Sequence, residues 1–209
     1  MKIQELLGKP AVWAIILSQY GQGVGMIGLL SWLPTYYAEK FNVPLTSLAS
    51  FTVFPYLLQM GVAVSAGIAA DTIIAKGEFS VLSTRTMFQI LGTIMPALCL
   101  LLCVYPPGNQ ALTAEKAELF ITVGLAFSAF TVASVSCNHF DISPRNAGTI
   151  FAIGNTASCI GGLLAVPFTG YIYDVTKSWD LVFLIFAGHY AGGTVAWLAL
   201  ASDKRIDGS

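Results

Sequence analysis

Charged residues are absent from six long stretches of the chain, and each of these stretches is mostly apolar. The stretches cover residues 10–38, 41–70, 86–114, 119–138, 146–173 and 181–202. A membrane-spanning helix needs about 20 apolar residues, because the hydrocarbon layer is about 30 Å thick, and every stretch is long enough. Segments such as Leu98–Leu102 and Leu181–Phe186 lack the alternating polarity of barrel strands. The pattern predicts an all-α membrane protein with six transmembrane helices.

Composition excludes several other classes of protein. Hydrophobic residues make up 56% of the chain and charged residues 10%, whereas soluble domains carry roughly 25% charged residues. The same apolar content excludes a disordered chain. The net charge is −1 without a basic block, so nucleic acid is not a predicted partner. The four cysteines do not suggest a disulfide framework, and without accompanying histidines they do not predict a metal site.

An even number of spans places both termini on one side of the membrane, and the basic residues predict which side. Seven basic residues fall on the side of the termini and three on the other. Cytoplasmic loops are enriched in lysine and arginine, so both termini are predicted to be cytoplasmic. We expect residues 1–11 to be a cytoplasmic lead-in, 12–201 to form the membrane domain, and 202–209 to be a cytoplasmic tail. The seven residues are Lys2, Lys9, Lys76, Arg85, Arg145, Lys204 and Arg205.

A few amide side chains interrupt the apolar spans. Gln19 and Gln22 are three residues apart and are expected on one helix face. Asn155 and Ser158 are related in the same way. An amide in hydrocarbon is costly unless it faces protein, water or ligand. Two interpretations stay open at this point, namely hydrogen bonds between helices and the lining of a polar cavity.

Polar residues near the cytoplasmic ends of the spans form a second set of candidates. Residues 138–145 are the most concentrated polar segment, in which His139 and Asp141 could pair with Arg145 or with a neighbouring loop. Asp71, at the end of the second span, could accept hydrogen bonds from the N-terminus of a neighbouring helix. No nucleophile motif or paired carboxylate accompanies these groups, so the chain is not predicted to be an enzyme.

Two further observations concern the interior of the spans. His189 lies in the middle of the sixth span. A neutral histidine paired with a backbone carbonyl is favoured there over a proton site. No acidic or basic residue lies inside any predicted span, so these six helices contain neither a proton relay nor a salt-bridged anion site of the usual kind.

Several segments, in order and at matching spacing, resemble the anion–cation symporter branch of the major facilitator superfamily. That branch includes vesicular glutamate transporters, sialin, sodium–phosphate transporters and plastidial anion transporters of plants. The string Asn-His-Phe-Asp-Ile-Ser-Pro-Arg at residues 138–145 is the most specific of the matches. The resemblance extends from about residue 4 to residue 207. Its segments are Pro10–Ile15, Leu33–Tyr37, Gly67–Asp71, Asn138–Gly148, Gly154–Ala157 and Ser178–Phe183.

The resemblance is to the second half of such a transporter, which carries twelve helices in two halves around a central site. It implies secondary active transport of an inorganic phosphate or small organic anion, coupled to Na⁺ or H⁺, with no other cofactor. The implied partners are the anionic solute, the lipid bilayer, and a missing N-terminal half or a second copy of this chain. The implied membrane is a plastid envelope, a lysosome or vesicle, or the plasma membrane. A non-transporting subunit of a membrane complex is the alternative.

The resemblance also assigns roles to individual residues. Gln22 aligns with an arginine that faces the substrate in glutamate-transporting members, which argues against glutamate as the substrate here. Gln19, Gln22 and Asn155 are the expected substrate-binding groups. The expected gating residues at the cytoplasmic side are Asp71, Arg85, His139, Asp141 and Arg145.

Overall fold

The computed structural model describes residues 2–109 and 111–207, and it contains six helices long and apolar enough to cross a membrane. The prediction of an all-α protein with six transmembrane helices is therefore confirmed. Met1 of the predicted lead-in lies outside the described residues, as do residues 208 and 209 of the predicted tail. The elements are α1 (Ile3–Leu7), α2 (Pro10–Phe41), α3 (Leu45–Lys76), α4 (Val81–Val104), η1 (Pro107–Asn109), α5 (Ala114–Ser128), η2 (Ala129–Ala133), α6 (Val135–Ile142), α7 (Ala147–Thr176) and α8 (Trp179–Leu200).

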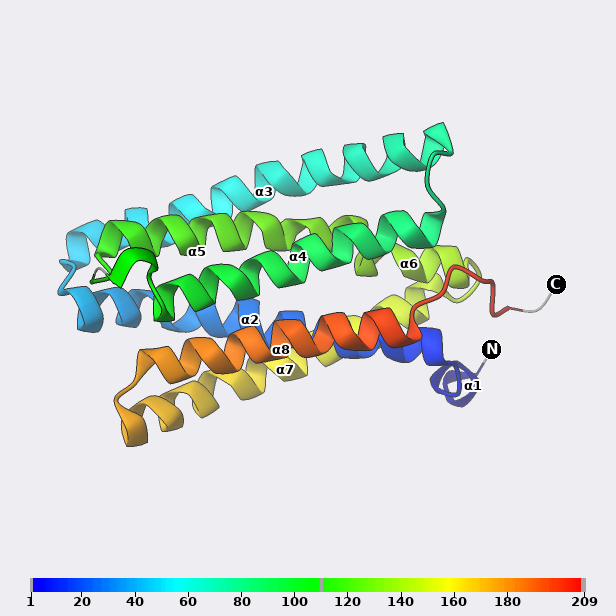
Figure 1. Cartoon of the computed structure of the whole chain (residues 1–209). Coiled ribbons are helices and arrows are strands. Elements are labelled where there is room, and N and C mark those ends of the chain that lie inside the picture. Colours follow the sequence, from blue (N-terminus) through cyan, green and yellow to red (C-terminus); the bar gives the residue numbers. More distant parts are fainter. Residues whose placement is uncertain (1, 110, 208–209) are drawn as a thin grey trace.

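The long helices run side by side, and both ends of the chain lie at the same end of the bundle (Figure 1). Several helices continue past the charges that were expected to end them. The connection after the second uncharged stretch is short, because α3 continues to Lys76 and α4 begins at Val81. Asp71 and Arg85 are therefore helical residues. A helix of 32 residues is about 48 Å long, so its ends can carry charges beyond the hydrocarbon layer.

Helix α2 is the centre of the bundle, and its glycines allow α7 and α8 to approach closely. A Cβ atom on Gly23 would lie 2.1 Å from the carbonyl oxygen of Ser158 on α7. On another face of α2, Gly21, Gly25 and Gly28 meet α8, where a Cβ on Gly25 would lie 2.3 Å from the ring of Tyr190. Small residues allow such backbone approach in membranes, so these glycines serve the packing of α7 and α8 on α2.

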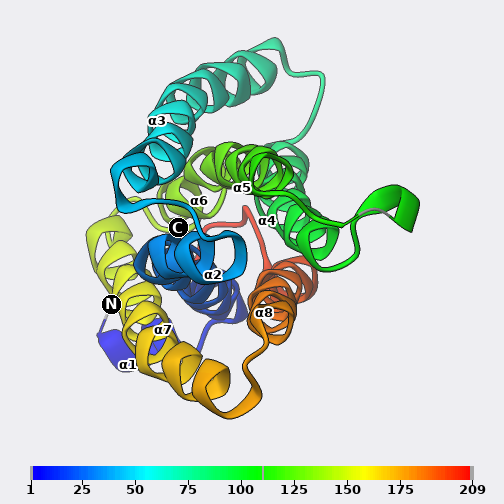
Figure 2. The same ribbon diagram turned by 90° about the vertical axis from the view of Figure 1, so that its left-hand side faces the viewer.

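Two helices are much less covered than the rest. In the apolar window of α3 only 11% of residues are buried, and in that of α7 only 28%, against 61% for α2. Seen along the bundle, α3 and α7 stand on either side of α2 (Figure 2). We call the side of the molecule that carries their exposed residues the α3–α7 face. The exposed large apolar residues of α3 are Val53, Phe54, Leu57, Leu58, Met60, Val64 and Ile68.

The fourth span is discontinuous. Its first part, α5, passes into the 3-10 segment η2, and the chain then turns at Ser134, whose φ and ψ angles are −119° and −99°. The short helix α6 follows and contains His139 and Asp141. The fourth uncharged stretch, 119–138, lies within the candidate span Ala114–Ile142. The interruption of its α-helix at residues 129–134, and the helical start of the polar segment, were not predicted.

Candidate functional site

The break in the fourth span exposes hydroxyl groups to the neighbouring helices. Backbone groups inside a membrane must find partners within the protein, and side chains supply some of them here. The Ser128 hydroxyl donates to the carbonyl of Leu125 at 2.7 Å, and the Thr131 hydroxyl donates to the carbonyl of Ser128 at 2.7 Å. Each hydroxyl oxygen still has lone pairs that can accept a hydrogen bond.

Two glutamine side chains donate to these oxygens from other helices. On α2, Nε2 of Gln22 donates to Oγ1 of Thr131 at 2.5 Å. On α3, Nε2 of Gln59 donates to Oγ of Ser128 at 2.8 Å. We call Gln22, Gln59, Ser128 and Thr131 the amide cluster. Each amide NH₂ has two N–H groups and uses one of them in these bonds. The second N–H of Gln59 faces the weak acceptor Sδ of Met26 at 3.9 Å, whereas the second N–H of Gln22 is left for a solute.

The other two predicted substrate-binding residues lie apart from the amide cluster. Gln19 is 6% exposed and faces α7, where a Cβ on Gly154 would lie 2.4 Å from its Oε1 atom. Asn155 is exposed on α7. It shares a helix face with Ser158, which lies against Gly23. The structure thus places Gln19 and Asn155 beside the α2–α7 contact, and their role in binding stays a prediction.

Three of the four cluster residues were not predicted as site residues. Gln59 is an amide in the second uncharged stretch, and its own segment gives no sign of its partner. Helix α3 continues through Pro55, and the Gln59 amide reaches Ser128 at the end of α5. Ser128 and Thr131 could not be distinguished by sequence from the other hydroxyl residues of the apolar spans.

The end of the bundle that carries both termini contains a buried ion pair between two of the predicted gating residues. Nε of Arg85 on α4 lies 2.9 Å from Oδ2 of Asp141 on α6, and Nη2 lies 3.4 Å from Oδ1. The side chains of Arg85 and Asp141 are 9% and 18% exposed. We call Arg85 and Asp141 the buried ion pair.

The same arginine holds the break in the fourth span. Its Nη1 donates to the carbonyl of Ala133 at 2.8 Å, and the Ser134 hydroxyl donates to the carbonyl of Arg85 at 2.6 Å. These bonds fix the first turns of α4 against the point where η2 becomes α6. A movement of α6 relative to α4 would therefore have to break a charge-assisted contact as well as neutral hydrogen bonds.

The remaining predicted gating residues do not join this pair. His139 is 3% exposed and packs against the rings of Phe140 and Phe151. Arg145 and Asp71 are exposed, and neither takes part in the ion pairs of the described residues. Asp141 thus pairs with Arg85 on α4 and not with Arg145, the first of the two partners that the sequence suggested.

The C-terminal segment lies across the connection between α6 and α7. Asp207 accepts hydrogen bonds from the Ser143 hydroxyl, and from Nδ2 of Asn146 at 2.9 Å. The hydrogen bond from Ser143 is the main cause of a lowered pKa of the Asp207 carboxyl group. The amide of Ile206 donates to the carbonyl of Ile142 at 2.8 Å. Residues 202–207 therefore form an ordered strap over the end of the bundle.

Comparison with known proteins gives one family and a consistent set of relatives. The sequence model of the Major Facilitator Superfamily matches residues 1–166. The sodium-dependent phosphate transport protein 1 of Arabidopsis thaliana chloroplasts is 34% identical over 203 residues, which are 96% of this chain and 38% of that protein. The chloroplastic ascorbate transporter of the same plant is 33% identical over 96% of this chain and 36% of its own length.

An animal relative is named for a further class of solute. The voltage-gated purine nucleotide uniporter SLC17A9 of Rattus norvegicus is 30% identical over 98% of this chain and 44% of its own length. The chain spans less than half the length of each of these three relatives. All three carry the name of a transporter and not of an enzyme, as expected from the motifs. The match of the family model over most of the chain shows that it belongs to the Major Facilitator Superfamily.

Proposed function

We propose that this chain forms one half of an anion transporter that works by alternating access, with a second six-helix unit on its α3–α7 face. The observation that carries the proposal is the position of the amide cluster. Gln22 and Gln59 are half-buried, on helices that border the least covered side of the molecule. A lipid-facing amide would lose hydrogen bonds with water. A water-containing cavity between two halves gives these amides a polar environment.

Apolar exposure alone would not support this proposal. Lipid tails cover an apolar helix as well as another helix does, so the exposed residues of α3 fit either neighbour. Polar groups discriminate between the two environments, because hydrocarbon cannot satisfy them. The amide cluster, together with the predicted lining residues Gln19 and Asn155, therefore supports a solute pathway along this side.

The chemistry of the cluster suggests how this half takes part in anion binding. Amide N–H groups and hydroxyl groups donate hydrogen bonds to phosphate or carboxylate oxygens without carrying charge. No basic side chain belongs to the cluster. Positive charge for the anion is then supplied by the second unit, or by a coupling Na⁺ or H⁺. Relatives named for phosphate, ascorbate and purine nucleotides make a small phosphate or organic anion the proposed substrate.

Uptake into proteoliposomes tests the proposal. The native protein, with any segment that precedes residue 1, should accumulate labelled phosphate or ascorbate. Gln59→Ala should raise the substrate concentration for half-maximal uptake roughly fivefold, because one neutral hydrogen bond is worth about 1 kcal/mol. Gln22→Ala should act similarly. Thr72→Ala is the matched control, since the exposed Thr72 hydroxyl bonds within its own helix to Ile68.

The outcomes separate the main alternatives. Absence of uptake of any tested anion by the intact native protein would support the non-transporting subunit instead. Uptake that is unchanged in both glutamine variants would remove the amide cluster from the pathway. Imposed Na⁺ and pH gradients identify the coupling ion, and uptake driven by membrane potential alone would exclude both ions.

A further inference from the structure

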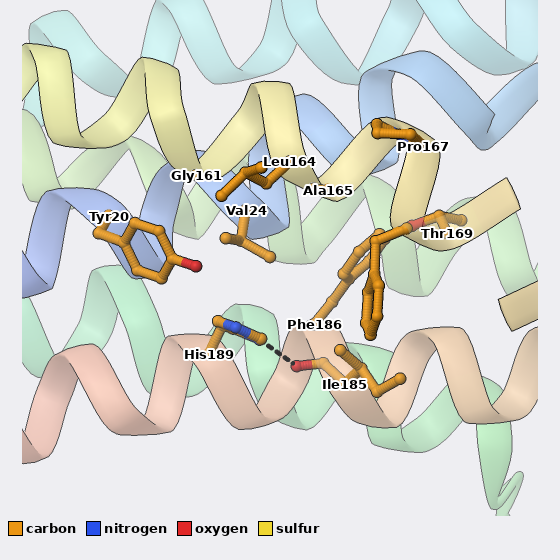
Figure 3. A pocket seen from close by; sticks show the side chains of 11 residues that line it. Tyr20, Val24, Gly161, Leu164, Ala165, Pro167, Thr169, Ile185, Phe186 and His189 are labelled. Atoms are coloured by element: carbon orange, nitrogen blue, oxygen red, sulfur yellow. Dashed lines mark hydrogen bonds between the residues drawn. The ribbon is translucent and has the colours of Figure 1, made fainter. Parts of the chain in front are cut away.

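A groove runs along α8, where it faces α2 and α7 (Figure 3). Helix α8 lies on a side of the bundle away from α3 (Figure 2). The groove consists of two adjoining hollows. The larger has a volume of about 570 Å³ and lies between α2, α7 and α8. The second has about 440 Å³ and continues along α2 and α8. Both are lined by Tyr20, Ile185 and His189, so these residues mark the point where the hollows meet. Each volume is in the range of pockets that bind small ligands, roughly 300–1,000 Å³.

The groove exists because α7 and α8 both pack along α2 but barely contact each other. Glycines extend it along α8. A Cβ atom built on Gly188 or Gly192 would meet nothing within 4 Å, although both residues line the second hollow. The close contacts of α8 with α2 are made by other positions, so these two glycines are not required for the packing of the helices within this chain.

The middle of the groove carries two polar groups in otherwise apolar surroundings. The ring of His189 bonds through Nδ1 to the carbonyl of Ile185 at 2.9 Å. A carbonyl oxygen only accepts, so Nδ1 carries the proton, and in the neutral ring Nε2 is left as an acceptor. The ring of Tyr20 lies 6.0 Å from that of His189, centroid to centroid, and its hydroxyl points into the space between α7 and α8 (Figure 3).

Neither group has its hydrogen bond satisfied inside the part of the chain that the structure describes. No partner of the Tyr20 hydroxyl or of Nε2 of His189 occurs among the described residues. His189 is the eleventh residue of the 22-residue helix α8, which places this pair near the middle of the membrane. Hydrocarbon offers no hydrogen bonds there, so an occupant that supplies one would be favoured over an alkyl chain.

We infer that this groove binds a lipid alcohol, an elongated apolar molecule with one hydroxyl group, from the surrounding bilayer. A hydroxyl can accept from Tyr20 and donate to Nε2 of His189 at the same time, whereas a carbonyl or ether can only accept. The apolar body lies in the larger hollow beside Phe168 and Phe186. An isoprenoid alcohol has this chemistry, with a flexible chain that can follow a groove bordered by three helices.

Photolabelling of the native protein in liposomes tests the inference. The probes are a photoreactive geranylgeraniol and its methyl ether, which keeps the shape and the acceptor but cannot donate. The alcohol should label the groove at least fivefold more than the ether. Tyr20→Phe should reduce labelling by both probes. His189→Phe should reduce labelling by the alcohol to the level of the ether and leave the ether unchanged.

A variant that fills the groove tests the inference without changing Tyr20 or His189. Gly192→Leu places a side chain in open space within the groove and should abolish labelling. Val195→Leu is the control on the same helix, because Val195 is exposed but does not line either hollow. Equal labelling by alcohol and ether, or labelling retained in Gly192→Leu, would overturn the inference. A change of oligomeric state in Gly192→Leu, without selective labelling by the alcohol, would assign the groove to a second copy of the chain instead.

Discussion

Neutralising Asp141 should destabilise the protein strongly, because it would leave the Arg85 guanidinium group buried without its counter-charge. Asp141→Asn keeps the size of the side chain and a neutral acceptor, so it isolates the effect of charge. Arg85 would retain its bond to the carbonyl of Ala133 at 2.8 Å. The guanidinium group cannot lose its proton to relieve the cost, and the side chain is only 9% exposed.

The expected magnitude follows from burial. Removing one partner of a buried ion pair typically costs roughly 3–5 kcal/mol. The Asp141 side chain is 18% exposed, so the lower end, about 3 kcal/mol, applies. By contrast, the pair between Lys40 and Asp180 has side chains 28% and 49% exposed. Asp180→Asn is therefore the matched control, with an expected cost of about 0–1 kcal/mol.

The assay is the free energy of unfolding in detergent micelles, measured by denaturant titration. It is measured for Asp141→Asn and Asp180→Asn, and for Arg85→Met and Asp141→Leu singly and combined. The double replacement should recover most of the loss, because apolar residues can replace a buried ion pair without net cost. A coupling energy below about 0.5 kcal/mol would show that Arg85 and Asp141 do not stabilise each other. An equal loss in Asp141→Asn and Asp180→Asn would refute the argument from burial.

Three further predictions concern separate parts of the molecule. Gly23→Val should prevent α7 from packing on α2 and abolish the folded protein in detergent. Gly61→Val, on the exposed side of α3, should fold normally. Equal yields of folded protein from the two variants would contradict this prediction. The folded protein lowers the pKa of the Asp207 carboxyl group below its usual value near 3.8. The carboxylate therefore stabilises the strap fully at pH values above 3.8. This contribution is lost as the pH falls through the lower pKa of the folded state. The protection of residues 202–207 from hydrogen exchange, relative to the intrinsic rate at each pH, should fall on acidification, and Asp207→Asn should remove this pH dependence. If Asp71 holds the predicted cytoplasmic side of the transporter closed, Asp71→Asn should alter the labelling of engineered cysteines in the proposed pathway. Unchanged labelling would exclude that role.

The number of helices could be predicted because hydrocarbon penalises charge so strongly. Six uncharged stretches therefore predict six spans. The ends of the helices could not be predicted in this way, because a helix that leaves the hydrocarbon layer meets water, where charged residues no longer end it. Asp71 lies within α3 and Arg85 within α4 for this reason. A charge marks the edge of the membrane better than the end of a helix.

The break in the fourth span was invisible for a different reason. Residues 129–134 read Ala-Phe-Thr-Val-Ala-Ser and contain neither proline nor glycine, the usual local causes of an interrupted helix. The partners that satisfy the break come from elsewhere in the chain. Arg85 donates to the carbonyl of Ala133, and the Ser134 hydroxyl donates to the carbonyl of Arg85. A discontinuity held by tertiary contacts has no signature in its own sequence, so Ser128 and Thr131 of the amide cluster could not be predicted either.

Burial of Arg85 also bears on the predicted orientation in the membrane. A buried, paired arginine is part of the fold, so it is weaker evidence for a cytoplasmic loop than a free lysine. Without it the count of basic residues on the side of the termini falls from seven to six, against three on the other side, and the prediction of cytoplasmic termini stands. In a variant with the native cysteines replaced by alanine, a membrane-impermeant maleimide applied outside should label Tyr105→Cys and not Glu78→Cys, which lie beyond opposite ends of α4. Labelling of Glu78→Cys alone would reverse the orientation, and with it the side on which Arg85 and Asp141 lie.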